Sequence, residues 1–142
     1  MVESVVYNNK TLAMIIRNRH ECNGIDFITP GDYSQQVAYM HHPEGKKIDA
    51  HIHNEVHREV MLTQEVLFIK KGKLRVDFYD DQQSYLESRV IGEGDVILLV
   101  SGGHGFTVLE ELEMIEVKQG PYVGDEDKRR FEGVCDEQVK LR

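Results

Sequence analysis

Short apolar segments alternate with polar residues along most of the chain, and each one is closed by a turn signal. The pattern predicts two strands within 5–16, joined at Asn8 and Asn9, and a third strand over 36–40. Segment 46–53 alternates strictly and predicts a further strand, with its isoleucines on one face and its histidines on the other.

The middle of the chain carries the strongest strand signals. A hairpin is expected over 65–80, with its turn at Gly72 between two lysines. Further strands are expected over 85–91, 94–100, 104–110 and 111–119. Roughly nine or ten short strands in all predict a β-sandwich or barrel. Only segment 123–133 is expected to be helical.

Composition narrows the classes of protein that this chain can represent. Its 142 residues, 40% of them hydrophobic, suit a single domain with a real core. The 25 acidic residues outnumber the 17 basic ones, and a net charge of -8 argues against a nucleic-acid partner. No apolar run is long enough to cross a bilayer, and the first ten residues lack the features of a signal peptide. We therefore expect a soluble, cytoplasmic protein with no membrane partner, in which Cys22 and Cys135 are free thiols.

Histidines provide the main chemical signal, because five of the seven fall between positions 41 and 57. On a strand, His51 and His53 point to the same face and are close enough to bind one ion. Glu65 opens a very apolar segment, where an inward carboxylate needs a partner or an ion. His104 follows a buried strand through the small residues SGG. Together these four side chains would supply mixed nitrogen and oxygen ligation for a transition metal.

The spacing of these residues resembles the first sequence motif of the cupin family. That motif has glycine, five residues, HxH, a gap, glutamate, six residues and glycine. This chain has Gly45, KKIDA, His51 and His53, then Glu65, VLFIKK and Gly72. The gap between His53 and Glu65 holds eleven residues, more than the family has, and we interpret it as a longer hairpin tip.

The second cupin motif is present in altered form. It begins at Gly94, but Val100 stands where the family has proline, and His104 comes one residue early. The resemblance covers about 35–118 and is greatest to a small group of bacterial cupins without an assigned reaction. The shared segments are TQEVLFIKKGKLRVDFYD, SGGHGF and EVKQGPYVGDEDKRRF.

The resemblance implies an all-β fold, a single cupin jelly-roll barrel over 1–142 with its core at about 35–118. A short helical or irregular tail would follow over 120–142. The resemblance also implies a homodimer, in which the N-terminal strands over 3–17 would form the interface.

The resemblance further implies one metal in the mouth of the barrel. The cofactor would be a divalent transition metal: iron, manganese, nickel, copper or zinc. Its ligands would be His51, His53, Glu65 and His104.

Other chemistries have less support in the sequence. HNEVH, residues 53–57, imitates a zinc-protease motif, but Asn54 stands where the catalytic glutamate should follow the first histidine. The glycine-rich segment 92–105 lacks the residues of a phosphate loop, no serine lies in a GxSxG turn, and neither cysteine is expected to be a nucleophile. His41 and His42 are expected in an exposed turn.

The leading hypothesis is a metal-dependent enzyme that isomerises or oxidises a small polar molecule, such as a sugar derivative, an oxo acid or an enolisable ketone. His57 and Tyr39 are the candidates for a separate acid or base. Two alternatives stay open: a non-catalytic module that binds a small molecule, and a metal-free isomerase of deoxysugar synthesis for polysaccharides. A fold alone does not decide among these functions.

Overall fold

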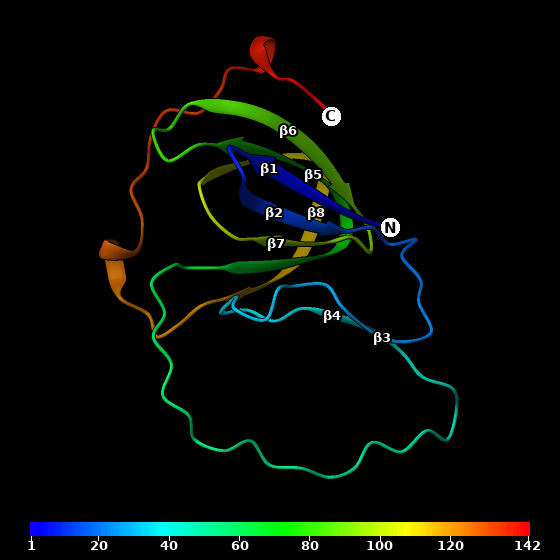
Figure 1. Ribbon diagram of the computed structural model, residues 1–142. Coiled ribbons are helices and arrows are strands. Elements are labelled where there is room, and N and C mark those ends of the chain that lie inside the picture. Colours follow the sequence, from blue (N-terminus) through cyan, green and yellow to red (C-terminus); the bar gives the residue numbers. More distant parts are fainter.

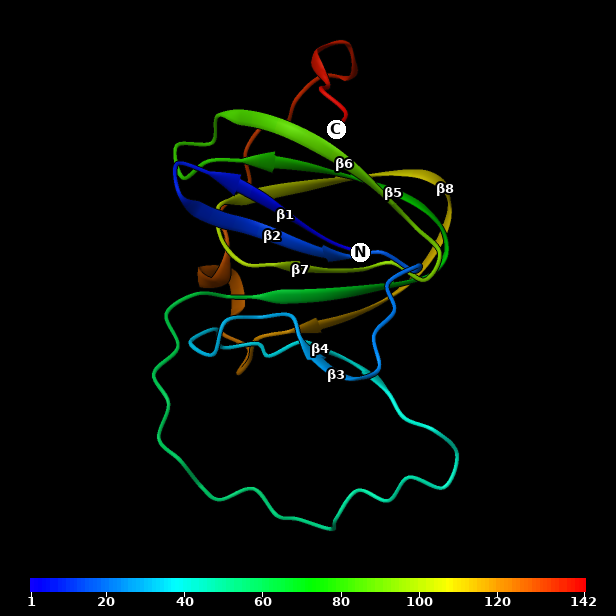
Figure 2. The ribbon, with the colours of Figure 1, turned by 45° about the vertical axis from the view of Figure 1, so that its right-hand side comes forward.

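One strongly curled β-sheet forms the body of the molecule (Figures 1 and 2). The computed structural model describes residues 1–142 and contains eight strands: β1 (Val2–Tyr7), β2 (Lys10–Ile16), β3 (Gly24–Phe27), β4 (Ala38–His41), β5 (Glu65–Tyr79), β6 (Tyr85–Gly92), β7 (Val96–Leu99) and β8 (Gly103–Lys118). Six strands make the curled sheet, in the order β1-β2-β7-β5-β6, with β8 also paired to β5. Strands β3 and β4 form a separate ribbon.

The expected all-β class is confirmed, and the curled sheet has the shape of a half-barrel (Figure 2). A complete jelly-roll barrel stays a prediction. The structure has no helix that is long and apolar enough to span a membrane.

The first hairpin agrees with its prediction. Strands β1 and β2 pair antiparallel and are joined at Asn8 and Asn9, which have φ angles of 47° and 59°. Asparagine tolerates this left-handed conformation better than most residues, and two such residues make the tight turn that hairpins favour.

The hairpin predicted at Gly72 is wrong, because β5 runs without a turn from Glu65 to Tyr79. Both halves of β5 pair with β8, which is also continuous although two strands were expected there. Gly72 has a φ of 87°, and a side chain there would overlap the carbonyl oxygen of Glu111 on β8. The register between β5 and β8 shifts three times between Ile69 and Leu74. The glycine therefore permits a bulged bend in two paired strands, not a reversal of one.

The bend changes which side chains of β5 face the core. Before it, the residues of β5 in the core cluster are Leu67 and Ile69, and after it they are Leu74, Val76 and Phe78. The inward positions thus change from odd to even numbers, as the extra residues of a bulge require. These residues belong to one core cluster: Val5, Leu12, Ala13, Ile15, Leu67, Ile69, Leu74, Val76, Phe78, Ile91, Ile97 and Leu99.

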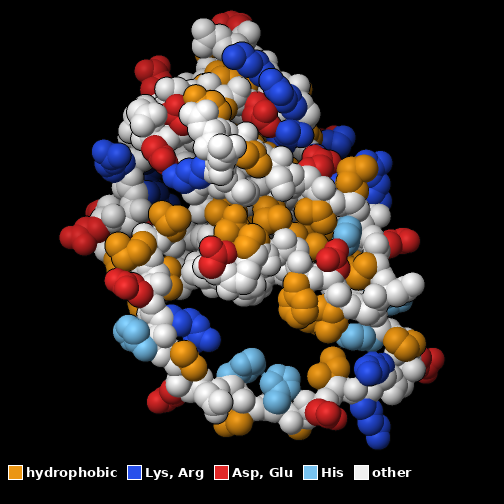
Figure 3. Space-filling view, viewed as in Figure 1, with side chains coloured by type: hydrophobic (Ala, Val, Ile, Leu, Met, Phe, Trp, Pro, Cys, Tyr) orange, Lys and Arg blue, Asp and Glu red, His pale blue; other side chains and the backbone are white.

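Segment 42–64 forms no strand, so the strand predicted over 46–53 is absent from this structure. The segment leaves the body after β4 as a wide loop, and Figure 3 shows an open hole between the loop and the rest of the molecule. Its isoleucines are exposed, Ile52 at 88%. Alternation alone does not make a strand, because a strand needs a neighbour to take up its backbone hydrogen bonds.

The C-terminal tail packs on the outer face of the second half of β5. The helix expected over 123–133 is limited to one 3₁₀ turn, η1 (Gly124–Asp127), and a second turn, η2 (Asp136–Gln138), follows. The ring of Phe131 meets that of Tyr79 edge-on at 4.9 Å, and the Val134 N–H donates to the Tyr79 hydroxyl. Burial raises the pKa of that hydroxyl. Between η1 and η2 the tail has no regular secondary structure and lies against the sheet through Phe131 and Val134.

Arg17 joins the N-terminal hairpin to the segment before β7. Its guanidinium donates two hydrogen bonds to Glu3, at 2.8 and 2.9 Å, and one of 3.0 Å to Asp95. The hydrogen bond from Arg17 is the largest cause that lowers the pKa of Glu3. A carboxyl group with a lowered pKa stabilises the fold above its unfolded pKa of about 4.3, and this contribution is lost as the pH falls through the folded pKa.

We predict that Glu3→Gln lowers the free energy of unfolding by about 1–2 kcal/mol near neutral pH, because a charged hydrogen-bond partner is lost. The difference from wild type should shrink as the pH falls below about 4. Urea unfolding across this pH range measures it. Glu111→Gln is the control, since Glu111 is 83% exposed in its pair with Lys71. If Glu3→Gln lowered the free energy of unfolding by the same amount at every pH, the charged interaction between Glu3 and Arg17 would not be the cause.

Candidate functional site

Glu65 and His104 lie close together in space, although the pairing of β5 with β8 places them far apart along the strands. His104 on β8 is directly opposite Phe78, which is 13 residues after Glu65 on β5. A straight strand would separate those positions by about 40 Å. In the structure, Nε2 of His104 is 3.3 Å from Oε2 of Glu65. The bend at Gly72 therefore brings the two halves of β5 to face each other.

Glu65 is a buried carboxylate on the inner face of the half-barrel. It has the same strand parity as Leu67 and Ile69, and it is 9% exposed. The interaction with the His104 ring lowers the pKa of Glu65, whereas burial acts in the opposite direction. The site thus holds a carboxylate beside an imidazole.

The loop that brings His104 to Glu65 is anchored to β2. The N–H of Val100 donates to the Leu12 carbonyl at 2.8 Å, and the Ser101 hydroxyl donates to that of Thr11 at 2.7 Å. A proline at position 100, as in the family motif, has no N–H for the first of these bonds. Gly102, with a φ of 71°, passes so close to Tyr79 that a side chain would overlap its carbonyl oxygen. Valine at position 100 therefore fits the local backbone, because its N–H takes part in the bond to Leu12.

A cavity of about 620 Å³ opens beside the Glu65–His104 pair. Loop residues 61–63 border it on one side, and the tail borders it on the other. The tail contributes three consecutive cations, Lys128, Arg129 and Arg130, and the carboxylate of Asp127. The cavity is large enough for a small polar molecule and offers charges of both signs.

The other two predicted ligands lie elsewhere in this structure. His51 and His53 are exposed on the loop over 42–64, with ring centroids 5.2 Å apart. Nδ1 of His51 is 2.9 Å from the Asp49 carbonyl oxygen. The structure thus brings together Glu65 and His104 but does not add the two loop histidines to them. The four-ligand site stays a prediction.

Neither candidate for a separate acid or base borders this cavity. His57 is exposed on the loop. Tyr39 lies on β4, where its ring packs edge-on against that of His20 at 5.0 Å. The exposed turn expected for His41 and His42 is wrong in part, since His41 ends β4 and His42 is half-buried.

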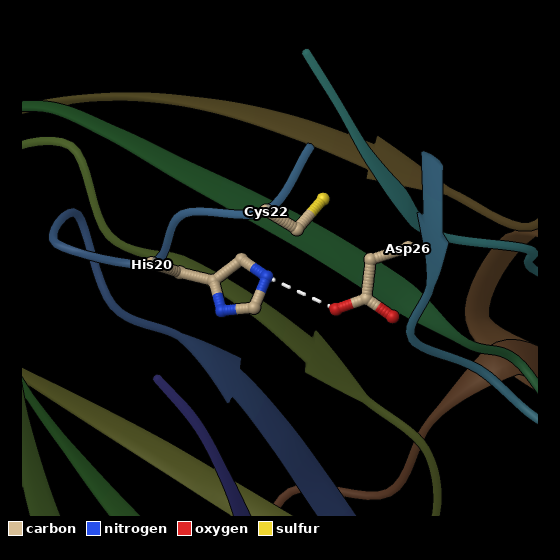
Figure 4. Close-up of side chains that lie close together, drawn as sticks. All are labelled: His20, Cys22 and Asp26. Carbon is tan, nitrogen blue, oxygen red and sulfur yellow. Dashed lines mark ion pairs between the residues drawn. The ribbon is translucent and has the colours of Figure 1, made fainter. Parts of the chain in front are cut away.

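The structure also shows a cluster that the sequence analysis missed. His20, Cys22 and Asp26 each offer a ligand atom, and these atoms lie within 4.8 Å of one another (Figure 4). The sequence did contain one signal for this cluster: His20 and Cys22 are two positions apart, and Asp26 follows four residues later. Cys22 is a free thiol, as expected, and it has His20 and Asp26 as neighbours.

No protein-family model, curated protein or solved structure matches this chain. Function therefore has to be inferred from the residues of the chain itself.

We predict that His104→Ala raises the pKa of Glu65 in metal-free protein. The variant removes the largest cause that lowers this pKa, while burial, which raises it, remains. An NMR titration of the Glu65 side-chain carboxyl carbon measures the change. His51→Ala is the control and should leave the titration unchanged. An unaltered Glu65 pKa in His104→Ala would show that the contact is not formed in solution.

Proposed function

We propose that this chain is a cupin-like metal-binding protein that acts on a small polar molecule. The observation that carries the proposal is the contact between Glu65 and His104. The fold bends two long strands so that a buried carboxylate and an imidazole meet beside a cavity of about 620 Å³. A buried carboxylate with a lowered pKa, beside an imidazole and a cavity, is a combination found at functional sites.

His51 and His53 would complete the site if segment 46–53 joined the free edge of β8. Strand β8 pairs only with β5, so its other edge has unpaired backbone groups. Phe106 and Val108 lie opposite the core residues Val76 and Leu74 and therefore face inward. Their exposures of 40% and 59% show that one wall of the half-barrel is open. A strand at this edge would close that wall.

The chain is long enough for this arrangement. His53 and Glu65 are separated by eleven residues, which span up to about 36 Å when extended. The strict alternation of 46–53 places both histidines on one face, which would be the inner one. Exposed strand edges readily accept another strand. The loop over 42–64 would thereby change from the open form of Figure 3 to the missing wall of a jelly-roll barrel.

Three imidazoles and one carboxylate would hold one divalent transition metal, which stays the proposed cofactor. Mixed nitrogen and oxygen donors suit iron, manganese, nickel, copper or zinc. Such an ion, when bound, supplies Lewis acidity toward a carbonyl or enolate oxygen. The cations of the tail, Lys128 to Arg130, would orient an anionic or polar group of the substrate. Isomerisation or oxidation of an oxo acid, sugar derivative or enolisable ketone fits this set.

A metal-free isomerase is the second candidate, and one observation favours it. Oε2 of Glu65 lies 3.3 Å from Nε2 of His104, within ion-pair distance. A carboxylate that orients an imidazole is a common arrangement for a general base. Under this reading, His104 would exchange a proton with the substrate, and His51 and His53 would not be required.

We predict that Glu65→Gln and His51→Ala each lose one equivalent of bound transition metal relative to wild type. The reason is that each variant removes one of four ligands. Elemental analysis after loading and desalting measures the content. His57→Ala is the matched control, since His57 is another histidine of the same loop and should keep the metal. Wild-type metal content in Glu65→Gln, together with a folded circular dichroism spectrum, would rule out the metal site.

We predict that metal slows hydrogen exchange in segment 46–53, because its amides would pair with β8. Mass spectrometry of the loaded and metal-free protein measures the change. The exposed turn at Asn8 and Asn9, which does not border the cavity, should exchange equally in both forms. One outcome would refute the docking of 46–53 at the edge of β8 but leave Glu65 as a ligand. In that outcome Glu65→Gln loses one equivalent of metal, while metal does not slow exchange in 46–53 of the wild type.

A further inference from the structure

A second group of metal-binding side chains lies apart from the Glu65–His104 pair. His20 and Cys22 come from the segment after β2, and Asp26 comes from β3. Their ligand atoms lie within 4.8 Å of one another, close to the distances between the donors of a single bound ion. Figure 4 shows the carboxylate of Asp26 facing the imidazole ring of His20, with the side chain of Cys22 beside them. None of the three borders the cavity at Glu65.

The imidazole of His20 is buried and has one unused nitrogen. The residue is 9% exposed, and its Nδ1 is 2.9 Å from the amino nitrogen of Met1. Its Nε2 is buried and makes no hydrogen bond, although it lies 3.1 Å from Oδ2 of Asp26. The carboxylate is therefore near this nitrogen without lying in the direction of a ring N–H. A buried polar atom without a hydrogen bond is costly, and a bound cation would remove that cost.

The arrangement differs from a catalytic triad of cysteine, histidine and aspartate. In a triad, the nucleophile and the carboxylate use opposite nitrogens of the imidazole. Here Asp26 faces Nε2, Cys22 lies toward the same side of the ring, and Nδ1 is taken by Met1 (Figure 4). Donors that converge on one point are the requirement for a metal site, not for a proton relay.

We propose that His20 Nε2, Cys22 Sγ and Asp26 Oδ2 bind a zinc ion, with His41 as the fourth ligand. Asp26 pairs with Tyr39 across the β3–β4 ribbon, so His41, two residues after Tyr39, lies on the same face as Asp26. His41 and Cys22 border a common cavity of about 450 Å³. Thiolate, imidazole and carboxylate are the ligands that zinc takes in tetrahedral sites.

The surroundings suit a structural ion. The Tyr39 ring packs edge-on against His20 at 5.0 Å and holds the imidazole in place. Four protein ligands would close the coordination sphere, in contrast to the open positions proposed at Glu65. The zinc ion would tie the segment after β2 to the small β3–β4 ribbon, which is a separate sheet.

Cobalt substitution tests the site through a signal that requires the thiolate. Metal-free, reduced protein is titrated with Co²⁺, and the near-ultraviolet charge-transfer band from sulfur to cobalt is recorded. We expect a band that saturates at one equivalent, is bleached by zinc, and is absent in Cys22→Ser. Cys135→Ser is the matched control, because Cys135 is the other free cysteine and lies outside the cluster. Asp26→Asn and His41→Ala should each weaken cobalt binding at least tenfold.

The outcomes separate this site from the one at Glu65. Glu65→Gln should keep the thiolate band, even if it loses its own equivalent of metal, because the two sites share no residue. No band in wild type, or a band that survives in Cys22→Ser and disappears in Cys135→Ser, would overturn the proposal. A band with unchanged cobalt affinity in His41→Ala would overturn the fourth ligand. Circular dichroism of each metal-free variant confirms that lost binding does not reflect unfolding.

Discussion

The bend that β5 and β8 share at Gly72 is the constraint on which the rest of the structure depends. The two strands stay paired on both sides of the bend, so they must curve together and shift register together. The half before the bend carries Glu65, and the half after it lies beside His104. Because the two strands curl back, residues from both halves of β5 face each other in one core. The same curl brings Glu65 and His104 together. A flat sheet with the same pairing would have neither.

Local signals in the sequence predicted the elements that depend on local chemistry. The turn at Asn8 and Asn9 and the buried segment around Ile97 are both present as predicted. Gly72 was misread because a glycine between two strand-like segments fits a hairpin turn and a bulge equally well. The choice depends on β8, about 40 residues later in the chain, whose backbone at Glu111 occupies the space beside the glycine. A pattern within one segment carries no information about such a partner.

In the candidate site, too, features that depend on neighbouring residues in the sequence were predicted, and contacts between distant segments were not. The apolar context of Glu65 correctly indicated a buried carboxylate with a partner, and that partner is His104. The pair HxH was read as part of a strand, but in this structure the surrounding loop pairs with no other strand. His20 and Cys22 were overlooked because their significance comes from Asp26 and from the burial of one ring nitrogen. Burial of a single atom depends on tertiary packing.

The order of strands has a consequence for synthesis on the ribosome. Ile15 on β2 pairs with Ile97 on β7, so the first hairpin gains its neighbour only after some 80 further residues have been made. Until then, Leu12 and Ile15 have no core to enter, and the hairpin alone is too small to be stable. The hairpin therefore exposes its apolar side chains until β7 has been made, and exposed apolar surface of this kind favours aggregation during folding.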